Sequence, residues 1–279
     1  MAQKSKLTLR LKSRGGYKMQ SIKNEKTAEI VGLSFGDGSL TRRHSGRDKG
    51  RLRFQLRGNI TEDKEHYDKY IIPLFNEIFS LNINPVVCNG KDKSYGISIE
   101  SAKICNLLQE LKIPVGIKRE LKIPDWITLN ENFSKSFLRG LIDTDGSVYC
   151  KKDYNYPAKG YIKIRIAIGS ISKNLIKESS HLLKNLGIHN LILKDYKPMA
   201  LNCKEVSRLQ IDGPNVLDYF NVISSKNPKH ITKFQVWKKF GFCPPRTMIE
   251  QRYLMLKESA NILSAGVSEP GQIQLVEAV

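Results

Sequence analysis

The stretch that decides the fold of this chain reads Phe137-Leu138-Arg139-Gly140-Leu141-Ile142-Asp143-Thr144-Asp145-Gly146. Its apolar residues have helical spacing, and the pattern ends in acidic residues followed by a glycine. We expect Ser134 to cap the start of this helix and Gly146 to give the backbone freedom for a sharp exit. The stretch therefore predicts a helix with an acidic side chain at its C-terminal end.

The same pattern occurs earlier in the chain, as Ile30-Val31-Gly32-Leu33-Ser34-Phe35-Gly36-Asp37-Gly38. The alignment places Gly32 on Gly140, Gly36 on Thr144, Asp37 on Asp145 and Gly38 on Gly146. Residues four apart share one face of a helix, so each helix carries a flat strip of small residues. Two such strips let two helix backbones approach closely.

Parallel packing of these two helices would bring Asp37 and Asp145 together at one end. Two carboxylates that close repel each other unless a cation lies between them. Hard oxygen ligands of this kind favour Mg²⁺. The repeated motif thus predicts one metal site.

The sequence that follows each motif also repeats in order, element type and spacing. In the first half we expect strands at 39–43 and 51–57, a helix at 63–79 that Pro73 kinks or restarts, a hairpin of 85–88 with 95–99 around Asn89 and Gly90, and a helix at 102–111. In the second half we expect strands from 147 and around 162–168, a helix at 174–186, strands at 191–194 and 206–211, and a helix at 214–222. Asn24 and Thr27 are both candidates to cap the first motif helix. The chain therefore predicts an internal duplication of α+β class, with two αββαββα halves.

The clearest alternating segment has one basic face. Leu52, Phe54 and Leu56 point one way along it, and Arg51, Arg53, Gln55 and Arg57 point the other. A solvated outer face usually mixes charge signs, whereas Arg and Gln commonly read base edges. This strand therefore indicates a nucleic-acid surface.

The two motif stretches resemble the two LAGLIDADG motifs of single-chain homing endonucleases, with 140–146 nearly the consensus. In the first motif Phe35 stands where the family often has its first acid. The resemblance covers roughly residues 25 to 240 and implies a saddle of two pseudo-symmetric antiparallel sheets with the motif helices at the centre. It implies a site-specific double-stranded DNA endonuclease that uses Mg²⁺ to hydrolyse phosphodiester bonds and leaves short 3′ overhangs at a long target site. We expect Mn²⁺ to replace Mg²⁺, and Ca²⁺ to support binding only.

The resemblance also implies roles for single residues. We expect Asp37 and Asp145 to bind metal with help from Gly36 and Thr144, Gln55 to orient a catalytic water, and Lys118 to stabilise charge. In the second half Arg165 or Ala167 aligns with Gln55, and Lys229 aligns near Lys118, so we expect two unequal sites. Lys151 and Lys152, which follow the second motif closely, are alternative sources of the positive charge there. The residues expected to bind DNA are Arg42, Arg43, Arg51, Arg53, Gln55, Arg57, Lys91, Lys93, Lys151, Lys152, Lys163, Arg165, Lys194 and Arg208. A plain phosphate contact is an equal alternative for each lysine.

Composition agrees with a polyanionic partner. Among 279 residues, 46 Lys plus Arg against 27 Asp plus Glu give a net charge of +19. Such a surplus favours nucleic acid over an anionic membrane. The sequence has no apolar run long enough to span a bilayer and no secretory signal, and its five cysteines have no paired spacing. We therefore expect a monomer inside the cell, in the cytoplasm, on the nucleoid or in an organelle.

We expect five segments: a basic N-terminal arm at 1–23, a first half at 24–113, a proline-bearing linker at 114–130, a second half at 131–240 and a C-terminal helix and tail at 241–279. Two rival functions stay open. One is an RNA maturase that helps its own intron fold. The other is a DNA-binding regulator of the same fold that does not cut.

Overall fold

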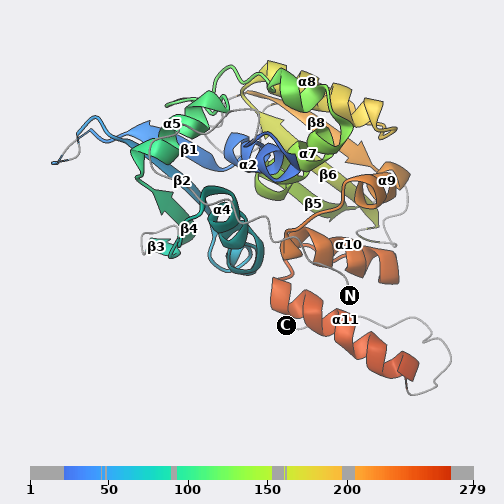
Figure 1. Cartoon of the computed structure of the whole chain (residues 1–279). Coiled ribbons are helices and arrows are strands. Elements are labelled where there is room, and N and C mark those ends of the chain that lie inside the picture. Colours follow the sequence, from blue (N-terminus) through green and yellow to red (C-terminus); the bar gives the residue numbers. More distant parts are fainter. Residues whose placement is uncertain are drawn as a thin grey trace, which may run out of the picture.

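A computed structural model of the chain describes residues 22–44, 46–47, 49–88, 93–152, 160, 162–196 and 205–264 (Figure 1). The expected basic arm, the hairpin turn at Asn89 and Gly90, Lys91 and the tail after 264 lie outside these residues, apart from the last two residues of the arm.

The first half contains a mixed series of helices and strands. Its elements are α2 (Glu25–Phe35), β1 (Gly38–Arg42), β2 (Leu52–Asn59), α3 (Lys64–His66), the π-helical turn η1 (Tyr67–Ile71), α4 (Ile72–Phe79), β3 (Val86–Cys88), β4 (Ser94–Ile99) and α5 (Ala102–Glu110).

The second half repeats this series after a short helix and extends it at the C-terminal end. Its elements are α6 (Asp125–Thr128), α7 (Glu131–Asp145), β5 (Gly146–Lys151), β6 (Lys163–Ser170), α8 (Lys173–Asn185), β7 (Leu191–Tyr196), β8 (Val206–Asp212), α9 (Pro214–Val222), α10 (Pro228–Phe240) and α11 (Ile249–Ser264).

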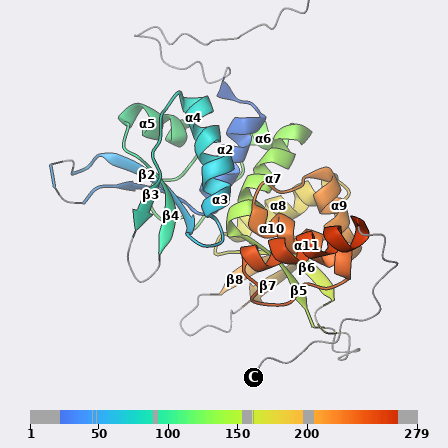
Figure 2. The same ribbon diagram turned by 90° about the horizontal axis from the view of Figure 1, so that it is seen from below.

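The two halves have the same sheet topology. One four-stranded sheet has the order β1-β2-β4-β3, the other has the order β5-β6-β8-β7, and the described strand pairs are antiparallel. The α+β class and the duplicated αββαββα plan are confirmed. Figure 2 shows the first half on one side of α2 and α7 and the second half on the other.

The motif helices α2 and α7 pack side by side at the centre. A Cβ atom added at Gly32 would lie 2.1 Å from the carbonyl oxygen of Phe137, and one at Gly140 would lie 2.4 Å from that of Glu29. The flat strips are therefore needed for the approach of the two backbones. Arg139 of α7 also donates to the buried Glu29 of α2, with Nη2 to Oε2 at 2.6 Å.

The alternation expected along β2 is also confirmed. Leu52, Phe54 and Leu56 are buried in the core, and Arg53 and Arg57 are half-buried on the opposite face. Residues directly opposite each other in an antiparallel pair share a face. The polar face of the first sheet therefore also carries Ser39 and Ser98, the partners of Gln55.

One local detail differs from the sequence prediction. Asn130, not Ser134, caps α7, because its side chain accepts from the backbone N–H of Phe133 at 3.0 Å, and Ser134 lies inside the helix, where its hydroxyl donates to Ile127. The irregularity expected near Pro73 is confirmed, because the π-helical turn η1 lies directly before α4 and Pro73 lies in the first turn of α4. For α2, Asn24 is the cap.

A buried polar cluster also joins the halves. Asp143 of α7 accepts from the hydroxyl of Ser225 at 2.5 Å and from the backbone N–H of Lys226 at 2.7 Å. His66 Nε2 and His230 Nδ1 lie 4.0 and 3.6 Å from its two oxygens. Asp143 is thus an anchor of the interface and does not face the surface, unlike Asp145.

Within the described residues, no helix has the length and apolar character needed to cross a bilayer.

Candidate functional site

Asp37 and Asp145 meet where α2 and α7 end. The close approach of the two helices continues to the end of the motifs, since a Cβ at Gly36 would lie 2.0 Å from Thr144 Oγ1. The two carboxyl groups that follow Gly36 and Thr144 lie close enough for each to act on the pKa of the other. The sequence prediction that the repeat brings these two acids together is confirmed as geometry.

The pair has unusual electrostatics. Both side chains reach solvent on one side, yet protein atoms surround them on the others. Desolvation first, then repulsion from Asp145 and Asp63, raises the pKa of Asp37 to about 7. Desolvation also raises the pKa of Asp145, against the opposing effect of Lys118. At neutral pH the pair therefore favours a proton or a cation between its oxygens.

Lys118 lies beside this pair. Its Nζ donates to the carbonyl oxygens of Ser34 at 3.3 Å, Phe35 at 3.0 Å and Gly36, and so binds the C-terminal end of α2. Desolvation lowers the pKa of Lys118, although Asp145 and Asp37 act to raise it. A cation at a helix C-terminus is favourable, so Lys118 stabilises α2 and also places positive charge next to both acids.

Lys229 reaches the site from the second half but is not placed like Lys118. Its Nζ lies 2.7 Å from Asp63 Oδ1, and Asp63 also accepts from the side chain of Asn227 at 3.0 Å and from the backbone N–H of Asn59 at 2.9 Å. Burial would raise the pKa of Asp63, but the charge and hydrogen bond of Lys229 outweigh it and lower that pKa. The two lysines therefore have unequal surroundings.

Asp63 is a functional candidate that the sequence did not single out. It acts on the pKa of Asp37 from the first half, whereas its partners Asn227 and Lys229 come from the second. In the sequence, Asp63 stood out only as the first residue of a predicted helix, and that position gives no information about contacts across the molecule.

The donor set fits a hard divalent cation. No group of three or more His, Cys, Asp or Glu side chains able to hold a metal is found in the part of the chain that the structure describes. Mg²⁺ needs no such group, because it is usually held by one or two carboxylates together with water and substrate phosphate. Asp37 and Asp145 would hold it. Gly36 and Thr144, the other two predicted metal ligands, already have hydrogen-bond partners. The Gly36 carbonyl accepts from Lys118, and the Thr144 hydroxyl donates to the Gly140 carbonyl at 2.9 Å.

Strand register decides which residue of the second half corresponds to Gln55. Ser39 pairs with Gln55, and the equivalent Ser147 pairs with Ala167. Ala167 is therefore the counterpart, and Arg165 is not, since it lies two residues away and binds Asp212 with Nη2 to Oδ2 at 2.6 Å. The next strand places the buried Gln210 opposite Ala167, an amide that the sequence reading missed.

The first sheet carries predicted DNA-binding residues around Asp37. A groove of about 620 Å³ is lined by Asp37, Arg57, Asp63 and Lys93, together with neighbouring backbone. The Nε atoms of Arg53 and Arg57 are buried and have no hydrogen-bond partner within the described residues. Arg43 instead binds Glu100 at 2.9 Å, and Arg42 donates to the Gly50 carbonyl at 3.1 Å. Arg51 lies just before β2 and is exposed.

The basic residues of the second sheet are more dispersed. Arg208 donates to the Tyr149 hydroxyl at 2.7 Å and lies 4.7 Å from the centroid of the Tyr196 ring. The predicted lysines there are exposed or half-buried: Lys151, Lys152, Lys163 and Lys194.

Comparison with known proteins agrees with this geometry. The family model described as a LAGLIDADG-like domain matches residues 132–228. Variants of the homing endonuclease I-DmoI superpose with a TM-score of 0.51 and 19% identity, over 72% of this chain and 95% of theirs. The LAGLIDADG homing endonuclease I-LtrWI, bound to its target DNA, superposes with a TM-score of 0.50 and 13% identity, over 78% and 89%.

A curated relative shares a shorter region. The tRNA-splicing ligase RtcB of Methanocaldococcus jannaschii is 29% identical over 138 residues, which are 46% of this chain. The chain spans only 14% of the length of that ligase, so the match identifies a shared segment. From topology and superposition together, the chain has the fold of LAGLIDADG homing endonucleases, and its residues 132–228 match the model of a LAGLIDADG-like domain.

Proposed function

We propose that this chain is a site-specific double-stranded DNA endonuclease that uses Mg²⁺ to hydrolyse phosphodiester bonds and leaves short 3′ overhangs at a long target. The observation that carries the proposal is the pairing of Asp37 with Asp145 between two sheets whose polar faces bear arginine and lysine. A protein that only bound nucleic acid would gain nothing from two carboxylates facing phosphate, because they would repel it.

The residues of the site divide the work. Asp37 and Asp145 would hold Mg²⁺, and Lys118 would keep positive charge beside them. Bound Mg²⁺ would lower the pKa of a water molecule and offset the negative charge that builds up on the phosphate during hydrolysis. Arg57 and Lys93, which line the groove at Asp37, would position the DNA backbone.

Metal choice follows from the same oxygen donors. We expect Mn²⁺ to replace Mg²⁺ and Ca²⁺ to support binding only. The DNA complexes of I-DmoI that were solved with Mn and with Ca support divalent metals in general.

We also expect the chain to act as a monomer, because both halves that build the site belong to one chain.

The test is a cleavage selection with the purified protein and a randomised duplex library in Mg²⁺, in Ca²⁺ and in EDTA. We expect discrete double-strand cuts at one long site with Mg²⁺ and binding without cuts in Ca²⁺. Tight duplex binding with no cutting in any metal would favour the regulator. Retention of structured RNA with no duplex preference would favour the maturase.

The variants Asp37→Asn and Asp145→Asn test the metal site directly. Each should abolish double-strand cleavage and leave duplex binding in Ca²⁺ intact, because each removes one metal ligand and no phosphate contact. In EDTA each should also melt at a higher temperature than the wild type, since it removes carboxylate repulsion. Cutting at the wild-type rate by both variants would contradict the proposed site.

A further inference from the structure

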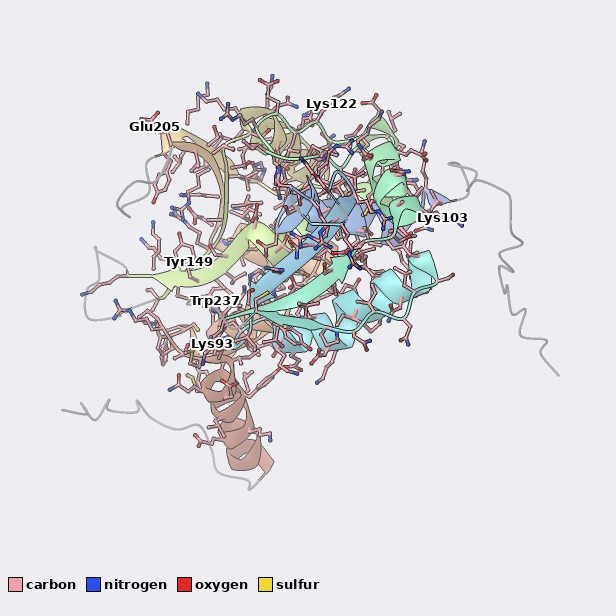
Figure 3. All side chains as sticks on the ribbon, turned by 90° about the vertical axis from the view of Figure 1, so that its left-hand side faces the viewer. Lys93, Lys103, Lys122, Tyr149, Glu205 and Trp237 are labelled. Carbon is pink, nitrogen blue, oxygen red and sulfur yellow. The ribbon has the colours of Figure 1, made fainter. Side chains whose placement is uncertain are left out.

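A second hollow lies at the far end of β5, where the segment after α10 meets the second sheet. Its volume is about 620 Å³. Its walls come from Tyr149 to Lys151 of β5 and from Lys152 after it, from Lys229 and Lys233 of α10, from Glu62 of the first half, and from residues 243–248. Figure 3 labels Tyr149 on β5, and Figure 1 shows α10 next to that strand, with α11 on the far side of α10. We refer to this hollow as the β5 pocket.

The charges of the β5 pocket do not balance. Among the described residues that line it, the one carboxylate is Glu62, which is bound by Arg252 at 2.7 Å, and Lys229 is bound by Asp63 at 2.7 Å. No ion pair within the described residues involves the other four cations, which are Lys151, Lys152, Lys233 and Arg246. A recess that gathers cations without partners is suited to an anion.

Two of these cations have unfavourable surroundings or backbone geometry in the free protein. Lys233 is half-buried on α10, and desolvation first, then repulsion from Arg252, lowers its pKa, with Lys229 adding to the repulsion and Glu62 opposing it. Arg246 has a backbone φ of 61°, in the left-handed region that favours glycine. Local strain of this kind is often found where a residue serves binding.

The position of the pocket identifies its anion. β5 starts at Gly146, directly after Asp145, and ends at Lys151 on the wall of the pocket. At about 3.3 Å per residue the two ends of the strand are about 17 Å apart. Along a duplex that distance corresponds to about five base pairs at 3.4 Å each.

We propose that the β5 pocket binds a backbone phosphate of the duplex, within about five base pairs of the bond cut at the Asp37 and Asp145 site. The assignment rests on the proposed function for the location of the cut. The C-terminal segment would then bind DNA through a phosphate contact that neither motif provides.

The experiment compares Lys233→Met and Arg246→Gly with a control variant, Lys184→Met, which removes an exposed lysine of α8. Duplex binding is measured in Ca²⁺ at several salt concentrations, and melting temperature is measured without DNA. Each pocket variant should bind more weakly, with the slope of log affinity against log salt smaller by about 1 than in the wild type. Each should also melt at a higher temperature, because a buried repulsion or a strained backbone is removed. The control should match the wild type in melting temperature and in the loss of binding caused by the methylphosphonate substitutions described in the next paragraph.

Neutral methylphosphonate substitutions along the target then locate the contact. A substitution within about five base pairs of the cut should weaken binding of the wild type and of Lys184→Met, and have no further effect on the pocket variants. Wild-type affinity and salt slope in both pocket variants would overturn the proposal.

A different outcome would assign the pocket to a free anion. If inorganic phosphate raises the melting temperature of the wild type and not of the pocket variants, while duplex binding is unchanged, the DNA assignment is wrong. Absence of cleavage by the wild type, with the binding differences intact, would remove the proposed nuclease function and leave the phosphate pocket standing.

Discussion

Arg53 and Gln55 are neighbours on the polar face of β2, and their surroundings in the free protein differ. Arg53 has a buried Nε without a hydrogen-bond partner within the described residues, and Gln55 lies between Ser39 and Ser98. A buried donor without a partner is rare in folded proteins. Both side chains therefore have capacity for contacts with a ligand at the centre of the first sheet.

We predict that Arg53→Ala or Gln55→Ala relaxes sequence discrimination at a few base pairs of the target. The expected loss is about 1 to 3 kcal/mol for each bidentate base contact. The measurement is binding in Ca²⁺ to a panel of targets that carry single substitutions. An equal loss of affinity for every sequence would instead identify a phosphate contact.

The sequence made some of these residues predictable and left others out of reach. Asp37 and Asp145 could be found because a repeated pattern of glycine and acid aligns them. Asp63 and Gln210 could not, because nothing local distinguishes them from ordinary polar residues. Asp63 becomes part of the site only through Asn227 and Lys229, which lie far away along the chain. The choice of Ala167, and not Arg165, as the counterpart of Gln55 could be made only from the strand register.

At the level of elements, the α2 and α7 pair depends on backbone contact. We predict that Gly140→Ala destabilises the protein by about 1 to 3 kcal/mol or more, because the new methyl would lie 2.4 Å from a backbone carbonyl that cannot move alone. Chemical denaturation measures the change. The matched control is Gly169→Ala in β6, where the nearest atom is a side-chain methyl at 3.4 Å. Equal effects of the two substitutions would argue against close helix packing.

The buried cluster of His66, Asp143 and His230 should make stability depend on pH. Burial, more than the opposing charge of Asp143, lowers the pKa of His66 to about 4, and burial also lowers that of His230. Unfolded histidines bind protons at about pH 6.5, so between pH 6.5 and 4 the unfolded chain binds more protons than the folded one. Hydrogen bonds and both histidines hold the pKa of Asp143 low despite burial, so its contribution is lost on further acidification.

We therefore predict that the free energy of unfolding falls as the pH is lowered from about 6.5 toward 4, and that His66→Phe makes this fall shallower. Phenylalanine keeps the stacking of residue 66 on Tyr70, whose ring centroid is 5.8 Å away. Denaturation at several pH values gives the slope. A slope that is unchanged in the variant would exclude His66 as a contributor. Asp63, Lys229 and His230 also act on this histidine and remain in the variant.

Regular elements were the part of the fold that the sequence predicted best, since helical and alternating periods were both clear. An irregularity near Pro73 was predictable, because proline cannot donate a helix hydrogen bond, but its form as a π-helical turn was not. Asn130 and Ser134 are both good capping residues, and burial of Ser134 against Ile127 decides between them.

On the scale of the whole molecule, α11 ties the C-terminal end to both halves. Its fully buried Arg252 binds Glu62 of the first half at 2.7 Å and Thr232 of α10 at 2.9 Å. From sequence α11 was expected only as one more helix of unknown role. A single arginine in a helical pattern gives no sign that it will be buried.

We predict that Arg252→Leu costs about 3 to 5 kcal/mol of folding free energy, because it leaves the partly buried Glu62 without its partner. Lys257→Leu, an exposed position on the same helix, is the control and should be near neutral. Denaturant unfolding of both variants provides the measurement. A neutral Arg252→Leu would mean that α11 does not stabilise the two halves together.

The glycine faces of the motif helices also have a consequence for synthesis. α2 is complete at Phe35, but the surface that covers its glycine strip does not exist until α7 has been made, from Glu131 to Asp145. Domains fold as the ribosome releases them, and contacts between distant residues form late. The first half therefore leaves the ribosome with its most closely packed face still open. During that interval the face is a place where two nascent chains can pair with each other, and translation speed through the linker and α7 determines how long it lasts.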